Sequence, residues 1–227
     1  MKTLGVVRLV IYGAVGFGIA WALLGALGGG FPLAGGVGLV LGGAIFSGDF
    51  PVLLLYTPVL SLGGAFGGAV LGLAFKDFRR VVILAVLGAL GFFVGSFIVV
   101  GLFFSLAFVR AGYGLIEALS AASLGLVIGA VLGLSLRSFR GTGVLALMGL
   151  VGFGIGGLIA AALQGFPLQP SESFPALQAA AFGAVEGIIG GASLGAALGY
   201  IESRQVSNTA RTTSQMNPKV AWERICH

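Results

Sequence analysis

Two glutamates lie inside long apolar runs of the sequence, where carboxyl groups are rare. Glu186 is near the middle of the last such run, in FGAVEGII, and Glu117 is about one turn inside an earlier one, in YGLIEALSAAS. An ionisable side chain within a membrane-spanning segment is a candidate functional group, because placing its charge in the bilayer is costly. Together with Ser120, these glutamates form a candidate intramembrane polar site for a proton, a cation or a polar ligand.

The spacing of glycines relates Ser120 to Glu186. When Gly129 is aligned with Gly195, Glu186 falls on Ser120. Ser120 is three residues from Glu117 and therefore on roughly the same helix face. A second interpretation is structural: a neutral carboxyl group hydrogen-bonds across a helical bundle or to another subunit. The sequence leaves both interpretations open.

Other chemistries lack their residues in this sequence. The one cysteine, Cys226, and the one histidine, His227, are adjacent in a polar segment, and two ligands there rarely make a metal site. The Gly-x-Gly-x-x-Gly pattern that begins at Gly152 stands within an apolar run, not between a strand and a helix of a nucleotide-binding fold. The sequence has no Ser-His-Asp or Cys-His set. We therefore expect no enzyme activity, no cofactor and no metal.

The composition is that of an integral membrane protein. Of 227 residues, 58% are hydrophobic and 8% are charged, whereas a soluble domain has about 25% charged residues. Each of the 42 glycines would weaken a soluble helix by roughly 1 kcal/mol. The net charge of +5 lies mostly in short gaps between apolar runs, which favours loops beside an anionic leaflet and argues against nucleic acid.

The sequence contains three related units. The string GAVLGL occurs at 68–73 and again, 61 residues later, at 129–134, and the copies run into the basic exits LGLAFKDFRR and LGLSLRSFRG. A weaker third copy, GAALGYIESR, begins at Gly195. The predicted membrane domain, 1–204, divides into repeats at about 7–80, 81–141 and 142–204, and a polar cytoplasmic tail follows at 205–227.

Each unit contains two apolar runs near the roughly 20 residues that a helix needs to cross a bilayer. We therefore predict an all-α integral membrane protein of about six transmembrane helices, arranged as three repeated helical hairpins. The predicted helices lie at about 9–28, 52–75, 82–108, 113–135, 143–163 and 176–200. The apolar stretch 34–47 is short for a span and is expected to be re-entrant or interfacial.

Glycine recurs every fourth residue in the second helix of each unit. Residues four apart share a helix face, and a face without side chains allows a neighbouring helix to approach closely. This glycine zipper predicts tight helix packing, either within the chain or against another subunit. The predicted packing glycines are Gly64, Gly68 and Gly72, then Gly125, Gly129 and Gly133, and then Gly187, Gly191 and Gly195.

The basic residues predict an orientation in the membrane. With six spans, every lysine and arginine except Arg110 falls on the side shared by the two termini. Because lysine and arginine are enriched in cytoplasmic loops, we predict a multi-pass protein of the cell membrane with both termini in the cytoplasm.

The sequence favours a non-catalytic membrane scaffold, that is, an accessory or assembly subunit of a larger membrane complex. The expected partners are the lipid bilayer and either other membrane subunits or further copies of the chain. The alternative is a small channel or transporter for protons, cations or a small ligand that uses Glu186 and Glu117. Internal repeats are common in transporters, but theirs are often inverted, whereas these even-span hairpins share one orientation.

Overall fold

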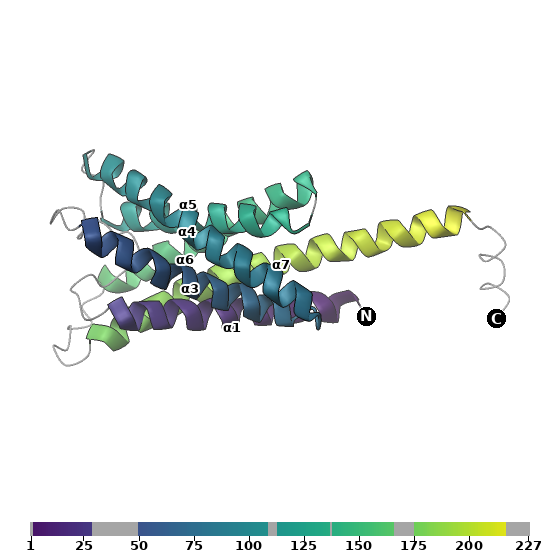
Figure 1. The fold of residues 1–227 in the computed structure, drawn as a ribbon, viewed down its shortest axis with the longest axis horizontal. Helices are drawn as coiled ribbons and strands as arrows, with labels where there is room; N and C mark the ends of the chain where they lie inside the picture. The colour runs from purple at the N-terminus through teal and green to yellow at the C-terminus, as the bar shows by residue number, and fades with distance from the viewer. Residues whose placement is uncertain (1, 29–49, 109–112, 137, 166–174, 217–227) are drawn as a thin grey trace.

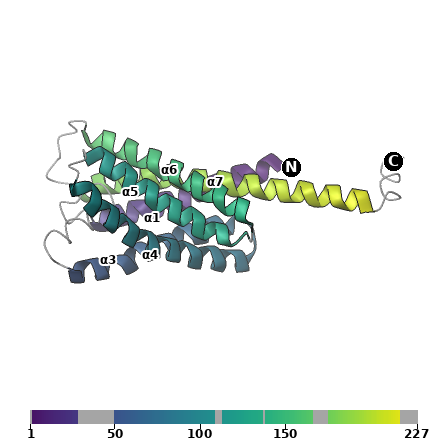
Figure 2. The same cartoon turned by 90° about the horizontal axis from the view of Figure 1, so that it is seen from above.

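The computed structural model describes residues 2–28, 50–108, 113–136, 138–165 and 175–216. Within these residues all regular secondary structure is helical. The helices are α1 (Lys2–Gly28), α3 (Phe50–Leu73), α4 (Phe78–Phe108), α5 (Tyr113–Leu134), α6 (Phe139–Gly165) and α7 (Pro175–Met216). They form one elongated bundle (Figures 1 and 2). The all-helical class predicted from the sequence is confirmed.

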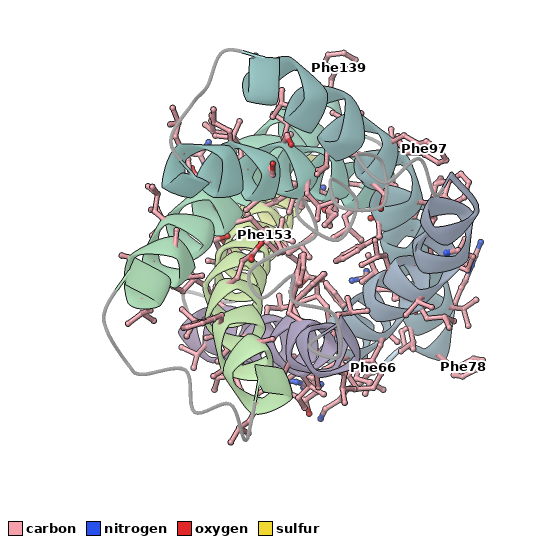
Figure 3. All side chains as sticks on the ribbon, turned by 90° about the vertical axis from the view of Figure 1, so that its left-hand side faces the viewer. Phe66, Phe78, Phe97, Phe139 and Phe153 are labelled. Carbon is pink, nitrogen blue, oxygen red and sulfur yellow. The ribbon has the colours of Figure 1, made fainter. Side chains whose placement is uncertain are left out.

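The six helices form a closed ring when the bundle is viewed along its length (Figure 3). Around the ring, α1 lies beside α3, α3 beside α4, α4 beside α5, α5 beside α6, α6 beside α7, and α7 beside α1. Alternate contacts are the closest ones: α1 with α7, α3 with α4, and α5 with α6. The ring is therefore closed by helices from opposite ends of the described chain.

Four of the described helices are long and apolar enough to cross a membrane. These spans are Gly5–Ala26 in α1, Phe78–Val99 in α4, Phe139–Leu163 in α6 and Ala179–Gln205 in α7. Shorter apolar stretches, Thr57–Leu73 and Ala118–Leu134, lie in α3 and α5. Large apolar side chains such as Leu62, Val86 and Leu158 are exposed on the outside of the bundle. Such a surface suits acyl chains rather than water, so the chain is a multi-pass membrane protein.

Glycine brings the closest helix pairs into backbone contact. A Cβ atom on Gly68 of α3 would overlap the carbonyl oxygen of Leu84 in α4, and one on Gly129 of α5 would overlap that of Leu145 in α6. At three crossings two glycines face each other, and a Cβ on either would overlap the carbonyl oxygen of the other. These pairs are Gly64 with Gly88, Gly125 with Gly149, and Gly13 with Gly191. A larger residue at these positions would separate the helices.

These close contacts lie within the chain, a question that the sequence had left open. They pack α3 against α4 and α5 against α6, and the helices of each of these pairs are consecutive in the chain. The two helices of each predicted unit, by contrast, have looser contacts with each other. The remaining close pair, α1 with α7, has no connecting turn in the described chain.

Phenylalanine and leucine fill the interior of the ring. Phe17 of α1, Phe92 of α4 and Phe153 of α6 are fully buried. The ring centroid of Phe17 lies 6.5 Å from that of Phe92 and 6.0 Å from that of Phe153. Because these rings come from alternate helices, they meet across the centre of the bundle. Buried leucines extend this core, namely Leu9, Leu84, Leu145, Leu71, Leu132 and Leu198.

Two helices begin about four residues before their predicted starts. α4 begins at Phe78 and α6 at Phe139, because the preceding residues, Asp77 and Ser138, act as N-caps. Their side-chain oxygens accept hydrogen bonds from backbone N–H groups of the first helical turn. The added turns include Arg79 and Arg80 in α4 and Arg140 in α6.

The last helix, α7, is longer than its apolar run. It continues to Met216, beyond the predicted end at residue 200, and extends past the rest of the bundle (Figure 1). Residues 201–216 include no glycine or proline that would stop a helix. The assignment of 205–227 as a cytoplasmic tail stays a prediction, and the stretch 34–47 lies outside the described residues.

Candidate functional site

The turn between α3 and α4 positions a group of charged residues at one end of the bundle. At the end of α3, Phe75 N donates to Gly72 O at 3.0 Å and Lys76 N donates to Leu73 O at 3.2 Å. Lys76 has a positive φ of 56°, in the left-handed region that lets a chain leave a helix abruptly. α4 then begins directly after Asp77.

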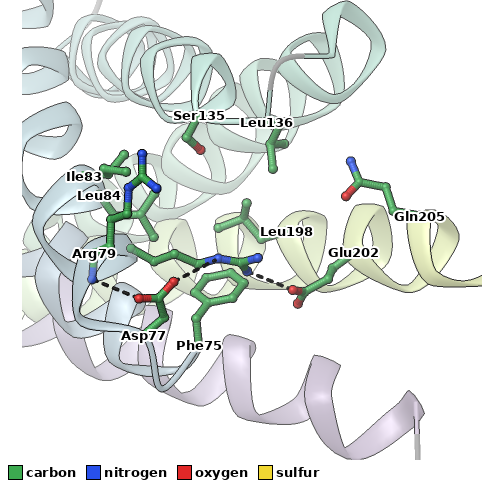
Figure 4. A pocket seen from close by; sticks show the side chains of 11 residues that line it. Phe75, Asp77, Arg79, Ile83, Leu84, Ser135, Leu136, Leu198, Glu202 and Gln205 are labelled. Carbon is green, nitrogen blue, oxygen red and sulfur yellow. Dashed lines mark hydrogen bonds and ion pairs between the residues drawn. The ribbon is translucent and has the colours of Figure 1, made fainter. Parts of the chain in front are cut away.

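Arg80 connects this turn to the last helix. Its Nη1 donates to Oε1 of Glu202 in α7 at 2.9 Å, and its Nε lies 3.9 Å from Oδ2 of Asp77. Its guanidinium carbon is 4.6 Å from the centroid of the Phe75 ring (Figure 4). Asp77 also accepts a hydrogen bond from Arg79 N at 3.0 Å. The start of α4 and the far end of the membrane part of α7 are thus linked through one guanidinium.

A cavity of about 410 Å³ lies beside Arg80, between α4, α5 and α7 (Figure 4). Its charged wall includes Arg79, Arg80 and Glu202. Its apolar wall consists of Ile83, Leu84, Leu136 and Leu198. A second cavity of about 420 Å³ shares Arg80 and Glu202 with the first and extends to Gly5 and Arg8 of α1. Cavities of this size accommodate small molecules.

Arg8 supplies another guanidinium to the same end of the bundle. Its Nη2 donates to the carbonyl oxygen of Leu73 at 3.1 Å, and its guanidinium carbon lies 5.6 Å from the centroid of the Tyr12 ring. Leu73 is the last residue of α3, and its carbonyl oxygen, which also accepts from Lys76 N, thereby gains a second donor. A cation there also stabilises the negative end of the helix dipole.

Positive charge exceeds negative charge around the two cavities. Three guanidinium groups, those of Arg8, Arg79 and Arg80, lie with the two carboxylates of Asp77 and Glu202. The paired side chains are 42–52% exposed, so each ion pair contributes at most about 1 kcal/mol to stability. The Arg79 guanidinium has no ion-pair or hydrogen-bond partner in the described part of the chain. This arrangement is suited to binding an anion.

The polar site predicted from the sequence lies deeper in the bundle. Glu186 of α7 is 3% exposed and Ser120 of α5 is 4% exposed. The backbone of Glu186 packs against Gly156 of α6. The Ser120 hydroxyl finds no hydrogen-bond partner among the described residues, so no hydrogen bond joins it to Glu186. The side chain of Glu117 lies outside the described residues.

Trp21 is a further buried polar residue in this region. A Cβ atom on Gly187 of α7 would meet its Cδ1 atom, and its ring centroid is 5.6 Å from that of Phe92 and 6.2 Å from that of Phe153. Trp21 is 3% exposed, and its Nε1 has no hydrogen-bond partner within the described residues. Within the described residues, two buried polar atoms, Trp21 Nε1 and Ser120 Oγ, thus lack a hydrogen-bond partner.

Sequence analysis did not single out Arg80, Glu202 or Trp21. One signal for Arg80 was present: when the basic exits KDFRR and RSFRG are aligned, Arg80 falls on Gly141, so the two related segments differ there in both charge and size. Glu202 is 122 residues from Arg80 in the chain, and no local pattern reveals a contact over that separation.

The chain matches no known protein family, no curated protein and no solved structure.

Proposed function

We propose that the chain is a non-catalytic membrane scaffold, an accessory or assembly subunit of a larger membrane complex. The observation that carries this proposal is the filled centre of the ring, where the side chains of Phe17, Phe92 and Phe153 meet without exposed surface. Conduction requires a pore lined by groups that replace the hydration of the ion or solute. Packed aromatic rings across the centre offer no such lining.

In this proposal, glycine zippers hold three repeated hairpins together as six membrane spans. Facing glycines occur at three crossings, where Gly64, Gly125 and Gly191 follow the offsets of 61 and 66 residues seen in the sequence, and Gly88 and Gly149 are again 61 residues apart. Close backbone approach adds dispersion contacts and weak Cα–H···O bonds, which stabilise helix pairs in a bilayer. Tight internal packing leaves the outer apolar surface available to other subunits or to further copies of the chain.

The proposed topology has both termini in the cytoplasm, because the basic turns and the extended end of α7 lie at one end of the bundle. Single cysteines can test it after Cys226 is replaced by serine. Lys76→Cys in a basic turn should resist an impermeant maleimide added to intact cells, and Glu172→Cys should react. Reaction of Lys76→Cys with protection of Glu172→Cys would reverse the orientation.

A transporter is the second candidate function, and the buried Glu186 together with the unpartnered Ser120 and Trp21 atoms favours it. Purified protein in liposomes separates the two candidates. A scaffold should give no proton or cation flux above that of empty liposomes. It should also elute from a mild detergent column with stoichiometric partners or as a discrete oligomer, whereas a monomer without partners would count against the scaffold.

Glu186→Gln sharpens the same experiment. A charge at the bilayer centre costs roughly 2–3 kcal/mol even on insertion scales, and a scaffold has no use for it. Glutamine retains most of the hydrogen bonding of a neutral carboxyl group, so Glu186→Gln should leave assembly and stability nearly unchanged. A clear wild-type flux that disappears in Glu186→Gln would replace the scaffold by a transporter with Glu186 at its functional centre.

A further inference from the structure

We propose that the cavity beside Arg80 binds the phosphate headgroup of an anionic phospholipid, with Arg79 as its main ligand. Both arginines line this cavity. The Arg80 guanidinium is already engaged by Glu202, Asp77 and the Phe75 ring, whereas the exposed Arg79 guanidinium has no such partner in the described part of the chain. A free guanidinium offers two parallel N–H donors to phosphate oxygens.

The α4 surface next to Arg79 suits an acyl chain. Arg79, Ile83, Val86 and Leu90 follow the spacing of one helix face. Ile83 lines the cavity and is also 38% exposed, while Val86 and Leu90 are exposed farther along the span. The wall of the cavity is therefore continuous with the lipid-facing surface of α4. A lipid with its phosphate at Arg79 would lay a chain along this stripe.

The depth of the cavity agrees with the headgroup layer. Phe78, the residue before Arg79, is 81% exposed and begins the apolar span Phe78–Val99. An exposed apolar ring at the end of a span needs acyl chains around it, which places the following residue near the headgroup layer. The cavity opens within the next turn of α4, and together with the adjoining cavity it is bordered by three guanidinium groups and two carboxylates. This charge balance favours an anionic headgroup over a zwitterionic one.

Arg140 provides a matched control in the same chain. It stands 61 residues after Arg79, follows the exposed Phe139, and precedes the exposed Leu147 and Val151 of α6. It lines neither of the two cavities. General attraction to an anionic leaflet acts on both arginines. A difference in lipid binding between their glutamine variants therefore measures the contribution of the cavity.

The test compares wild type, Arg79→Gln and Arg140→Gln by native mass spectrometry of bound lipid during titration with phosphatidylglycerol. Loss of a charge-assisted bond to phosphate predicts roughly tenfold weaker binding for Arg79→Gln, and Arg140→Gln should change it less than about twofold. Equal losses in the two variants would overturn the proposal. This site does not depend on the scaffold function.

Two further titrations establish the source of the phosphate and guard against misfolding. Soluble glycerol 3-phosphate lacks acyl chains and should bind far more weakly than phosphatidylglycerol, and equal binding would overturn the lipid assignment. Phosphatidylcholine has the same phosphate beside a compensating ammonium, so it should bind wild type more weakly than phosphatidylglycerol, and equal binding of the two lipids would overturn the preference for an anionic headgroup. The melting curves of wild type and Arg79→Gln in phosphatidylcholine should coincide. If Arg79→Gln melts early, Ile83→Ser replaces it, and phosphatidylglycerol binding that is unchanged in Ile83→Ser would also overturn the assignment.

Discussion

The turn between α3 and α4 and the turn between α5 and α6 share backbone hydrogen bonds and differ in their side chains. After α3, Phe75 N donates to Gly72 O at 3.0 Å, and after α5, Leu136 N donates to Gly133 O at the same distance. Each following helix has a capping side chain before it and an exposed phenylalanine as its first residue. The described backbone hydrogen bonds thus recur at equivalent positions in the two turns.

Among the described residues, ion pairs are found at only one of these turns. The caps are Asp77 in the first turn and Ser138 in the second, and three residues later the chain has Arg80 in the first and Gly141 in the second. Arg80 reaches Glu202 and borders both cavities, whereas Gly141 is buried. The two turns therefore have the same hydrogen bonds and helix packing, whereas the charged site beside a cavity lies at the first turn alone among the described residues.

The largest effect on both turns is expected when the two helices that each turn connects are forced apart. Gly68→Leu and Gly129→Leu place a side chain against the carbonyl oxygens of Leu84 and Leu145, respectively. Each should lower the free energy of unfolding by about 1–3 kcal/mol, as overpacked cores do, and by similar amounts. SDS titration of the protein in mixed micelles measures this quantity. Leucine at the exposed Ala181 is the control, and a loss confined to one hairpin would end the analogy.

The caps should show a smaller and equal effect. Asp77→Ala removes the acceptor of Arg79 N, and Ser138→Ala removes the acceptor of Gly141 N. Loss of an N-cap costs about 1 kcal/mol, which the same titration resolves. Asp77→Asn should retain most of the stability because the amide oxygen still accepts. Alanine variants as stable as wild type would show that neither cap holds its helix.

The smallest effect is expected from the ion pair that distinguishes the first turn from the second. Glu202→Gln removes the partner of Arg80 while leaving the α5–α6 turn untouched. Because this ion pair is about half exposed, the free energy of unfolding should fall by less than about 1 kcal/mol. The loss should vanish in about 1 M salt, where the Debye length is near 3 Å. A larger, salt-independent loss would mean that the pair is part of the core.

Much of the fold could be predicted from local sequence. Apolar length gave the helices, and the predicted and observed segments agree closely for α3 and α5. Glycine spacing identified faces that lie against other helices, because a missing side chain is a local property. It could not identify the partner, since Gly191 meets Gly13 from the opposite end of the chain.

The candidate site was less accessible to sequence reasoning. The cavity beside Arg80 needs arginines from the first turn of α4, a carboxylate from α7, and apolar side chains from α4, α7 and the turn after α5. Only the closed ring brings them together. Glu186 was conspicuous because charge is rare in an apolar run, and the structure does place it in the interior. The role of its carboxyl group stays a prediction.

The pairing of α1 with α7 places a condition on the synthesis of the protein. Two of the close pairs join helices that leave the ribosome in succession, so each can form soon after insertion. α1 emerges before the other described helices and its partner emerges after them. Until then the surface around Gly13 and Phe17 lacks the neighbour that covers it. Closure of the ring is consequently a late event of high sequence separation, the kind that slows folding. A chain cut short before α7 would retain its other hairpins yet present an open seam to the quality-control machinery of the membrane.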